Sequence, residues 1–86
     1  MELEIYRSQI DAIDEEILAK LEERFSISAK IGEYKKTNNL SVLDAEREWE
    51  KLEAIENASK PELAEYNLDV FEAIIAASRS LQEDGE

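Results

Sequence analysis

The hydrophobic pattern over residues 2–36 predicts one long helix. Apolar residues recur there at spacings of three, four or their multiples, the period of a helix with one apolar face. They are Leu3, Tyr6, Ile10, Ile13, Ile17, Leu21, Ile27, Ile31 and Tyr34. Asparagine tolerates the left-handed conformation that often ends helices, so we expect this helix to stop at Thr37-Asn38-Asn39.

Two shorter helices are predicted after a loop at residues 40–43. Asp44 can cap a second helix that runs to about Ala58. Ser59-Lys60-Pro61-Glu62 has the spacing of a capping box with an early proline, and it predicts a third helix that runs to about Gln82. The inward positions are Trp49, Leu52 and Ile55 in the second helix, and Leu63, Val70, Phe71, Ile74, Ile75 and Leu81 in the third. With only two glycines and one proline, the chain is predicted to be all-α, a single domain of three helices over residues 1–86.

The length of the first helix predicts a homodimer. Thirty-five helical residues span roughly 52 Å at a rise of 1.5 Å per residue. A compact domain of this size has a radius of gyration of only about 12 Å. Two shorter helices cannot cover so long an apolar face, whereas a symmetric partner can.

Composition and charge exclude several classes of function. The chain has 22 acidic and 10 basic residues and a net charge of −12, so nucleic acids and anionic membranes are poor partners. It has no cysteine and no histidine, which removes disulfides, thiolate metal sites, the usual general base and every Ser-His triad. No apolar run approaches the roughly 18 residues of a membrane helix, and the N-terminus lacks the features of a signal peptide. We therefore expect a cytoplasmic protein without metal or cofactor.

Polar residues occur on helix faces that should be buried. Arg24 interrupts a heptad column of isoleucines and leucine in the first helix. Lys35 lies eleven residues later, about three turns, and so shares the face of Arg24. The neighbouring heptad column is Arg7, Asp14, Leu21, Ser28 and Lys35. With Arg24 and Lys35, the set comprises Asp44, Arg47 and Glu48 in the second helix, and Ser78 and Gln82 in the third. Buried cations are costly without a partner, so such a set indicates internal ion pairs or a bound anion.

Each of these residues alone has a plain structural interpretation. A lone arginine on a heptad column more often extends its charged end to water or forms an ion pair. Asp44 alone is a helix cap, Ser78 a packing serine, and adjacent charges such as Arg47 and Glu48 are usually solvated. The combination of three cations, two carboxylates, a serine and a glutamine on inward faces or helix ends favours a site.

The chain resembles the all-α chorismate mutases. The resemblance rests on Arg7-x-x-Ile10-x-x-Ile13-Asp14, Glu23-Arg24, Ile31-Gly32-x-x-Lys35, Val42-x-Asp44-x-x-Arg47-Glu48 and Ile74-Ile75-x-x-Ser78-x-x-x-Gln82. It covers nearly the whole chain, and only the segment between the second and third helices is short relative to some members. It implies an intertwined homodimer with two identical sites, each built mostly from one chain.

The resemblance also implies a role for each site residue. Arg24 corresponds to the arginine that holds one carboxylate of chorismate, and Arg7 to the arginine that the partner chain contributes to the other. Lys35 and Gln82 correspond to the two donors to the ether oxygen. The remaining binding positions are Glu48 and the backbone near Asp44, which receive the ring hydroxyl, and Arg47 and Ser78.

The implied reaction fits the composition, but two alternatives remain. Rearrangement of chorismate to prephenate moves no proton and needs no nucleophile, so a chain without histidine or cysteine can catalyse it by holding the substrate and stabilising charge on the ether oxygen. An isochorismate-pyruvate lyase has the same fold and breaks the same ether bond in a related substrate. A non-catalytic acidic helical dimer is the alternative from another class, but it gives no reason for Arg24, Lys35 and Gln82 to interrupt apolar stripes.

Overall fold

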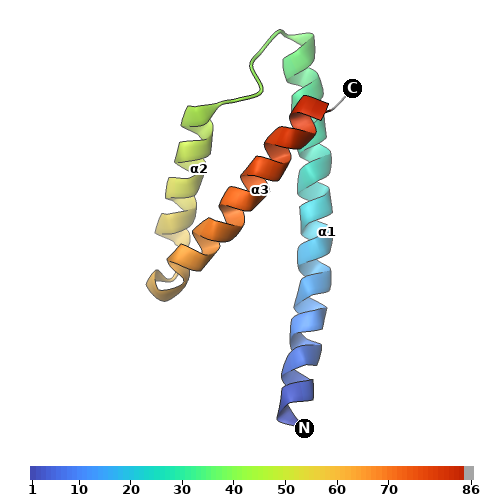
Figure 1. Cartoon of the computed structure of the whole chain (residues 1–86), viewed down its shortest axis with the longest axis vertical. Helices are drawn as coiled ribbons and strands as arrows, with labels where there is room; N and C mark the ends of the chain where they lie inside the picture. Colours follow the sequence, from blue (N-terminus) through green and yellow to red (C-terminus); the bar gives the residue numbers. More distant parts are fainter. Residues whose placement is uncertain (85–86) are drawn as a thin grey trace.

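The computed structural model describes residues 1–84, which form three α-helices and one short 3-10 helix (Figure 1). In chain order these are α1 (Glu2–Thr37), α2 (Ala45–Ala58), η1 (Pro61–Leu63) and α3 (Ala64–Asp84). The described residues include no strand, so the all-α prediction with a long first helix is confirmed. Gly85 and Glu86, the end of the predicted domain, lie outside the described residues.

The predicted ends of α1 and the start of α2 are confirmed. The backbone N–H of Asn38 donates to the carbonyl of Tyr34 at 3.0 Å, and Asn39 adopts the left-handed conformation with φ of 57°. The Oδ1 atom of Asp44 accepts a hydrogen bond from the backbone N–H of Arg47 at 3.0 Å, which satisfies a donor at the start of α2. Both signals are local, because the partner lies within four residues of the side chain that predicts it.

The predicted capping box at residues 59–62 is wrong. The Ser59 hydroxyl donates instead to the carbonyl of Ile55 at 2.6 Å, in the last turn of α2, and accepts from Nδ2 of Asn67 at 2.9 Å. It thereby satisfies a carbonyl at a helix end that has no partner within the helix. Pro61 opens the 3-10 helix η1, and α3 begins only at Ala64.

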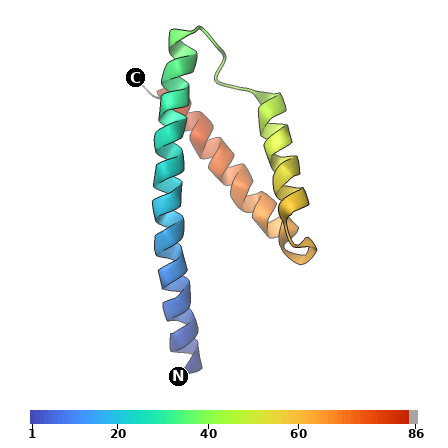
Figure 2. The ribbon, with the colours of Figure 1, turned by 180° about the vertical axis from the view of Figure 1, so that it is seen from behind.

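Helix α3 contacts both other helices. It runs diagonally from the end of α2 to the C-terminal part of α1, and α1 and α2 stand apart on either side of it (Figures 1 and 2). The N-terminal part of α1 extends well beyond the other helices (Figure 2). The molecule measures 56 × 28 × 14 Å with a radius of gyration of 16.0 Å, against about 12 Å for a compact domain of this length.

The crossing of α1 and α3 is close, and most of the residues buried in it are small. Ser28 and Gly32 of α1 are buried there, as are Ile75 and Ser78 of α3. A Cβ atom on Gly32 would lie 2.8 Å from the Cα atom of Gln82, closer than real Cβ contacts come. The missing side chain of Gly32 therefore allows the two helix backbones to approach.

Much of the predicted core is exposed in the single chain. Ile75 is the one apolar side chain that is buried among the described residues. The inward position predicted for Trp49 is wrong for the single chain, since Trp49 is 62% exposed, and Leu63 and Val70 are exposed too. Helical periodicity identifies an apolar face, but it does not say that the same chain covers that face. The exposed residues of the α1 stripe are Leu3, Tyr6, Ile10, Ile13, Ile17, Ile27, Ile31 and Tyr34.

None of the helices in the described part of the chain is long and apolar enough to cross a membrane.

Candidate active site

A cavity of about 290 Å³ lies where α1 and α2 stand apart over α3. This volume is just below the range for small-molecule sites, about 300 to 1,000 Å³. Its lining comes from all three helices: Arg24, Ile27, Ser28 and Ile31 of α1, Arg47, Glu48 and Lys51 of α2, and Ile75 and Ser78 of α3. Four of the predicted site residues, Arg24, Arg47, Glu48 and Ser78, therefore meet at one cavity.

Arg24 is held in the cavity wall by α3. Its Nη1 atom donates to the Ser78 hydroxyl oxygen at 2.5 Å. Arg24 is half-buried and Ser78 is buried at the helix crossing, 54 residues away along the chain. The guanidinium has five N–H donors, so the bond to Ser78 leaves donors for a ligand in the cavity.

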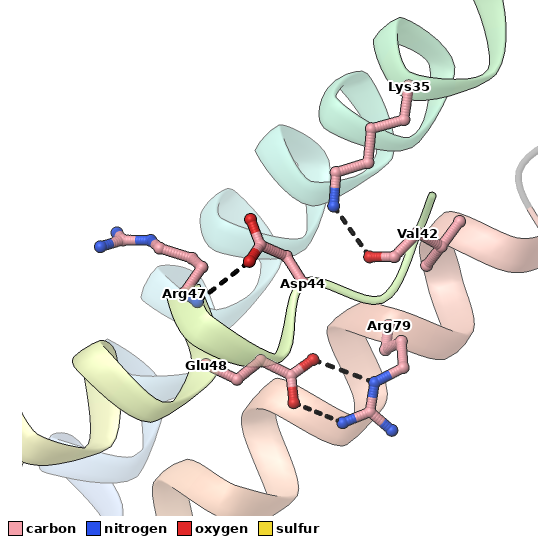
Figure 3. Close-up of polar contacts among 6 residues, drawn as sticks. All are labelled: Lys35, Val42, Asp44, Arg47, Glu48 and Arg79. Atoms are coloured by element: carbon pink, nitrogen blue, oxygen red, sulfur yellow. Dashed lines mark hydrogen bonds and ion pairs between the residues drawn. The ribbon is translucent and has the colours of Figure 1, made fainter. Parts of the chain in front are cut away.

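The cap of α2 places two charged side chains in its first turn. The Asp44 side chain accepts a hydrogen bond from the N–H of Arg47 and so fixes the start of α2. Arg47 and Glu48 therefore both lie in the first turn of the helix (Figure 3). The Arg47 side chain extends away from Glu48 (Figure 3). Lys51 lies one turn after Arg47 and lines the same cavity.

Glu48 is joined to Arg79 of α3 by a bidentate ion pair. Nε of Arg79 donates to Oε2 of Glu48 at 3.0 Å, and Nη2 donates to Oε1 at 2.6 Å (Figure 3). The hydrogen bonds to the Glu48 carboxylate, and then its charge, raise the pKa of Arg79 above its ordinary value. Arg79 is absent from the predicted site.

Lys35 and Gln82 meet beside the end of α1. The Lys35 ammonium donates to Oε1 of Gln82 at 3.2 Å and to the carbonyl of Val42 at 2.8 Å (Figure 3 shows the contact with Val42). The contact with Val42 ties the loop before α2 to α1, and the contact with Gln82 spans α1 and α3. Both residues are half-buried, and neither lines the 290 Å³ cavity.

The structure does not bring Arg7 to the other predicted residues within one chain. Arg7 is exposed on the N-terminal part of α1, where α1 lies clear of the other helices (Figure 1). It is 17 residues from Arg24 on the same helix, a separation of roughly 25 Å. One small ligand therefore cannot contact Arg7 and Arg24 of the same chain.

The cavity is positive although the chain is strongly acidic. Among the side chains that the structure describes, no carboxylate forms an ion pair with Arg24, Arg47 or Lys51. The one carboxylate of the lining, that of Glu48, is paired with Arg79. Three cations against one neutralised carboxylate, in a chain of net charge −12, make this cavity a candidate site for an anion.

Sequence reasoning missed Lys51, Arg79 and the apolar part of the lining. Lys51 could have been predicted from the sequence, because a residue four positions after Arg47 shares its helix face. Arg79 was not, because its partner Glu48 lies on another helix, and the register between α2 and α3 cannot be read from periodicity. Ile27, Ile31 and Ile75 were assigned to apolar stripes, and they are walls of the cavity.

Comparisons with known proteins agree with the earlier resemblance. The sequence profile of the family described as chorismate mutase type II matches residues 6–83. A bifunctional chorismate mutase/prephenate dehydratase of Aquifex aeolicus (strain VF5) is 38% identical over 86 aligned residues, which cover 94% of this chain. The chain spans about a quarter of that relative's length, 24%. No solved structure matches the chain at a significant level.

Proposed function

Because the chain belongs to the chorismate mutase type II family, we propose that it catalyses the rearrangement of chorismate to prephenate. The family match confirms the predicted enzyme class, an isomerase, at the level of the family. The observation that carries the proposal for this chain is the cationic cavity, in which Arg24, Arg47 and Lys51 have no carboxylate partner among the described side chains. Chorismate is a dianion at neutral pH, so its two carboxylates supply the missing negative charge.

In this proposal the arginines bind and shape the substrate. The planar guanidinium of Arg24, already fixed by Ser78, presents paired donors that suit a carboxylate, and Arg47 offers a second cation from α2. The enzyme must hold the flexible substrate in a chair-like shape in which the two carbon atoms that form the new bond lie close together. The C–O ether bond then breaks as the C–C bond forms, with no change in the atoms of the molecule.

Lys35 and Gln82 are the proposed donors to the ether oxygen, on which negative charge grows as the C–O bond breaks. They lie one helical turn beyond the lining residues Ile31 and Ser78, so the substrate would extend from the cavity toward them. An ammonium has three N–H donors, and Lys35 uses two of them on Val42 and Gln82, which leaves one for the substrate. Lysine can only donate, so Gln82 must present its amide oxygen to Lys35 and is left with its amide nitrogen as a donor. Donors fixed in this way stabilise the transition state without reorganisation.

The proposal includes an intertwined homodimer. Its support is the N-terminal part of α1, where the apolar side chains of one face are at least half exposed and the helix extends beyond the other helices (Figure 1). Apolar faces of this length are characteristic of interaction sites. In the dimer Arg7 would serve the partner's site, and Glu48 and the backbone near Asp44 would receive the ring hydroxyl of the substrate. The single-domain organisation and the cytoplasmic location stay predictions.

Product identification tests the proposed function. The protein is incubated with chorismate, and in parallel with isochorismate, and the products are identified by liquid chromatography with mass detection. We expect prephenate from chorismate and no product from isochorismate. Release of pyruvate from isochorismate would support the lyase instead. A folded dimer that transforms neither compound would support the non-catalytic alternative.

A further inference from the structure

The bidentate pair between Glu48 and Arg79 joins a residue of the cavity to one outside it. Glu48 lines the cavity, whereas Arg79 of α3 is not part of the lining. Among the described side chains it is the one ion pair between different helices, since Lys20 and Glu23 lie within one turn of α1. The side chains of Arg79 and Glu48 are 36% and 24% exposed. Exposed ion pairs contribute little to stability unless their geometry is ideal, and a bidentate pair such as this one can contribute. It is the position of the pair beside the cavity that suggests a further role.

The geometry fixes the Glu48 carboxylate and leaves it able to accept. Two N–H···O bonds from one planar guanidinium hold both carboxylate oxygens of Glu48. A carboxylate has about four lone-pair positions, and Arg79 occupies two of them. The remaining lone pairs can accept a hydrogen bond from a hydroxyl group in the cavity.

The same pair removes an electrostatic obstacle. An unpaired Glu48 carboxylate would repel an anionic ligand that Arg24 and Arg47 attract. When Glu48 is paired with Arg79, its oxygens can still accept hydrogen bonds, and the two side chains together carry no net charge. No other basic side chain forms an ion pair with Glu48 in the described part of the chain.

We propose that Arg79 is a positioning residue for the reaction: it orients Glu48 toward the ring hydroxyl of the substrate and neutralises its charge. The inference rests on the proposed function, and it adds a residue that does not itself touch the substrate. It makes two separable claims. Orientation depends on the fork of two N–H donors, whereas neutralisation depends only on a positive charge.

The test is a double-mutant cycle on chorismate turnover. Arg79→Leu alone should lower kcat/KM about tenfold, the scale of one charge-assisted hydrogen bond, through both a higher KM from lost neutralisation and a lower kcat from lost orientation. In the Glu48→Gln background the same substitution should change kcat/KM by less than about twofold, because Arg79 acts through the carboxylate. Arg79→Lys keeps the charge and loses the fork, so KM should return toward the wild-type value while kcat stays reduced. Lys60→Ala, which removes a charge from an exposed residue beside η1, is the control and should change neither parameter.

The outcomes separate this inference from the proposed function. A wild-type protein that does not convert chorismate overturns the proposed function and the inference with it. An active wild-type protein in which Arg79→Leu lowers kcat/KM equally with and without Glu48→Gln overturns the inference alone, as does unchanged activity of Arg79→Leu. Thermal melts followed by circular dichroism show whether Arg79→Leu folds. If it does not, the same cycle with Arg79→Lys decides the question.

Discussion

The two halves of α1 have the same helical geometry and the same apolar period but differ in what surrounds them. Every residue from 2 to 20 is exposed, and the apolar stripe there is at least 50% exposed at each position. From residue 21 onward α3 covers one face of the helix, at the positions Leu21, Arg24, Phe25, Ser28, Gly32 and Lys35. These positions are separated by one, three or four residues, and together they form a single stripe along the helix.

The comparison indicates which half has its partners within the chain. In the C-terminal half, Arg24 bonds to Ser78 and Lys35 bonds to Gln82, so the polar residues of the stripe already have partners on α3. In the N-terminal half the apolar residues have no covering element, and Arg7 has no site to serve. We infer that the second half holds the chemistry and that the first half is completed by another chain.

The largest effect is expected from a charge placed on the uncovered stripe. Ile10→Glu should prevent dimer formation and abolish activity, because an unpaired carboxylate in an apolar interface is very costly. Sedimentation and circular dichroism report assembly and folding, and chorismate turnover reports activity. Ser8→Glu adds the same charge about 200° away around the helix and should be tolerated. A dimeric, active Ile10→Glu protein would contradict the inference that this half is an interface.

A large effect is also expected at the covered end of the helix. Lys35→Ala removes a proposed donor to the ether oxygen and should lower kcat by about 10²-fold or more, with the dimer intact. Steady-state kinetics with chorismate measures the loss. Lys36→Ala, the neighbouring exposed lysine, is the matched control and should leave kcat within about twofold of wild type. Equal losses in the two variants would show that general charge, not the position of Lys35, accounts for the effect.

Gly32 tests the closeness of the helix crossing on which the Lys35–Gln82 contact depends. Gly32→Ala places a Cβ atom 2.8 Å from the Cα atom of Gln82, so one backbone must move. We expect a lower melting temperature, by the equivalent of about 1–3 kcal/mol, and a decrease in kcat of about tenfold. Alanine is the better helix former by up to about 1 kcal/mol, so a stabilised variant with unchanged kcat would show that the crossing is not tight.

Sequence alone predicts the features of this fold that depend on near neighbours. The end of α1 at Asn38 and the cap at Asp44 are correct because each side chain meets a backbone group within four residues. The capping box at Ser59 is wrong because a residue of α3, Asn67, and the last turn of α2 both compete for the same hydroxyl. Sequence alone does not reveal such a competitor, because which side chain of α3 contacts Ser59 depends on how the helices pack.

The candidate site shows the same division. The faces of Arg24 and Lys35 on α1 follow from helical spacing, and the structure places a side chain of α3 beside each. The bond between Glu48 and Arg79 requires the register of α2 against α3, which no single-helix pattern contains. Trp49 shows the limit of periodicity most clearly, because its apolar character predicts burial and the single chain leaves it exposed.

The smallest departure from wild-type activity, about fourfold, is expected for a refolded mixture of two inactive variants, and it tests most directly how the two halves combine. If two α1 helices pair antiparallel about a centre near Ile17 or Leu18, residue 7 of one chain lies level with about residue 28 of its partner. Ser28 lines the cavity and lies one turn from Arg24, so this pairing would deliver Arg7 to the site. Arg7→Ala and Arg24→Ala homodimers should therefore each be nearly inactive.

A mixture of these two variants should recover part of the activity. In a mixed dimer the Arg7→Ala chain supplies an intact Arg24, and its partner supplies an intact Arg7, so one site is complete and the other lacks both. Random reassociation makes about half of the dimers mixed, so unfolding and refolding an equal mixture should restore roughly a quarter of wild-type activity. Native mass spectrometry of differently tagged chains confirms that the subunits have exchanged. Mixed dimers without recovered activity would show that Arg7 does not act in the partner's site, and the N-terminal half of α1 would then serve assembly alone.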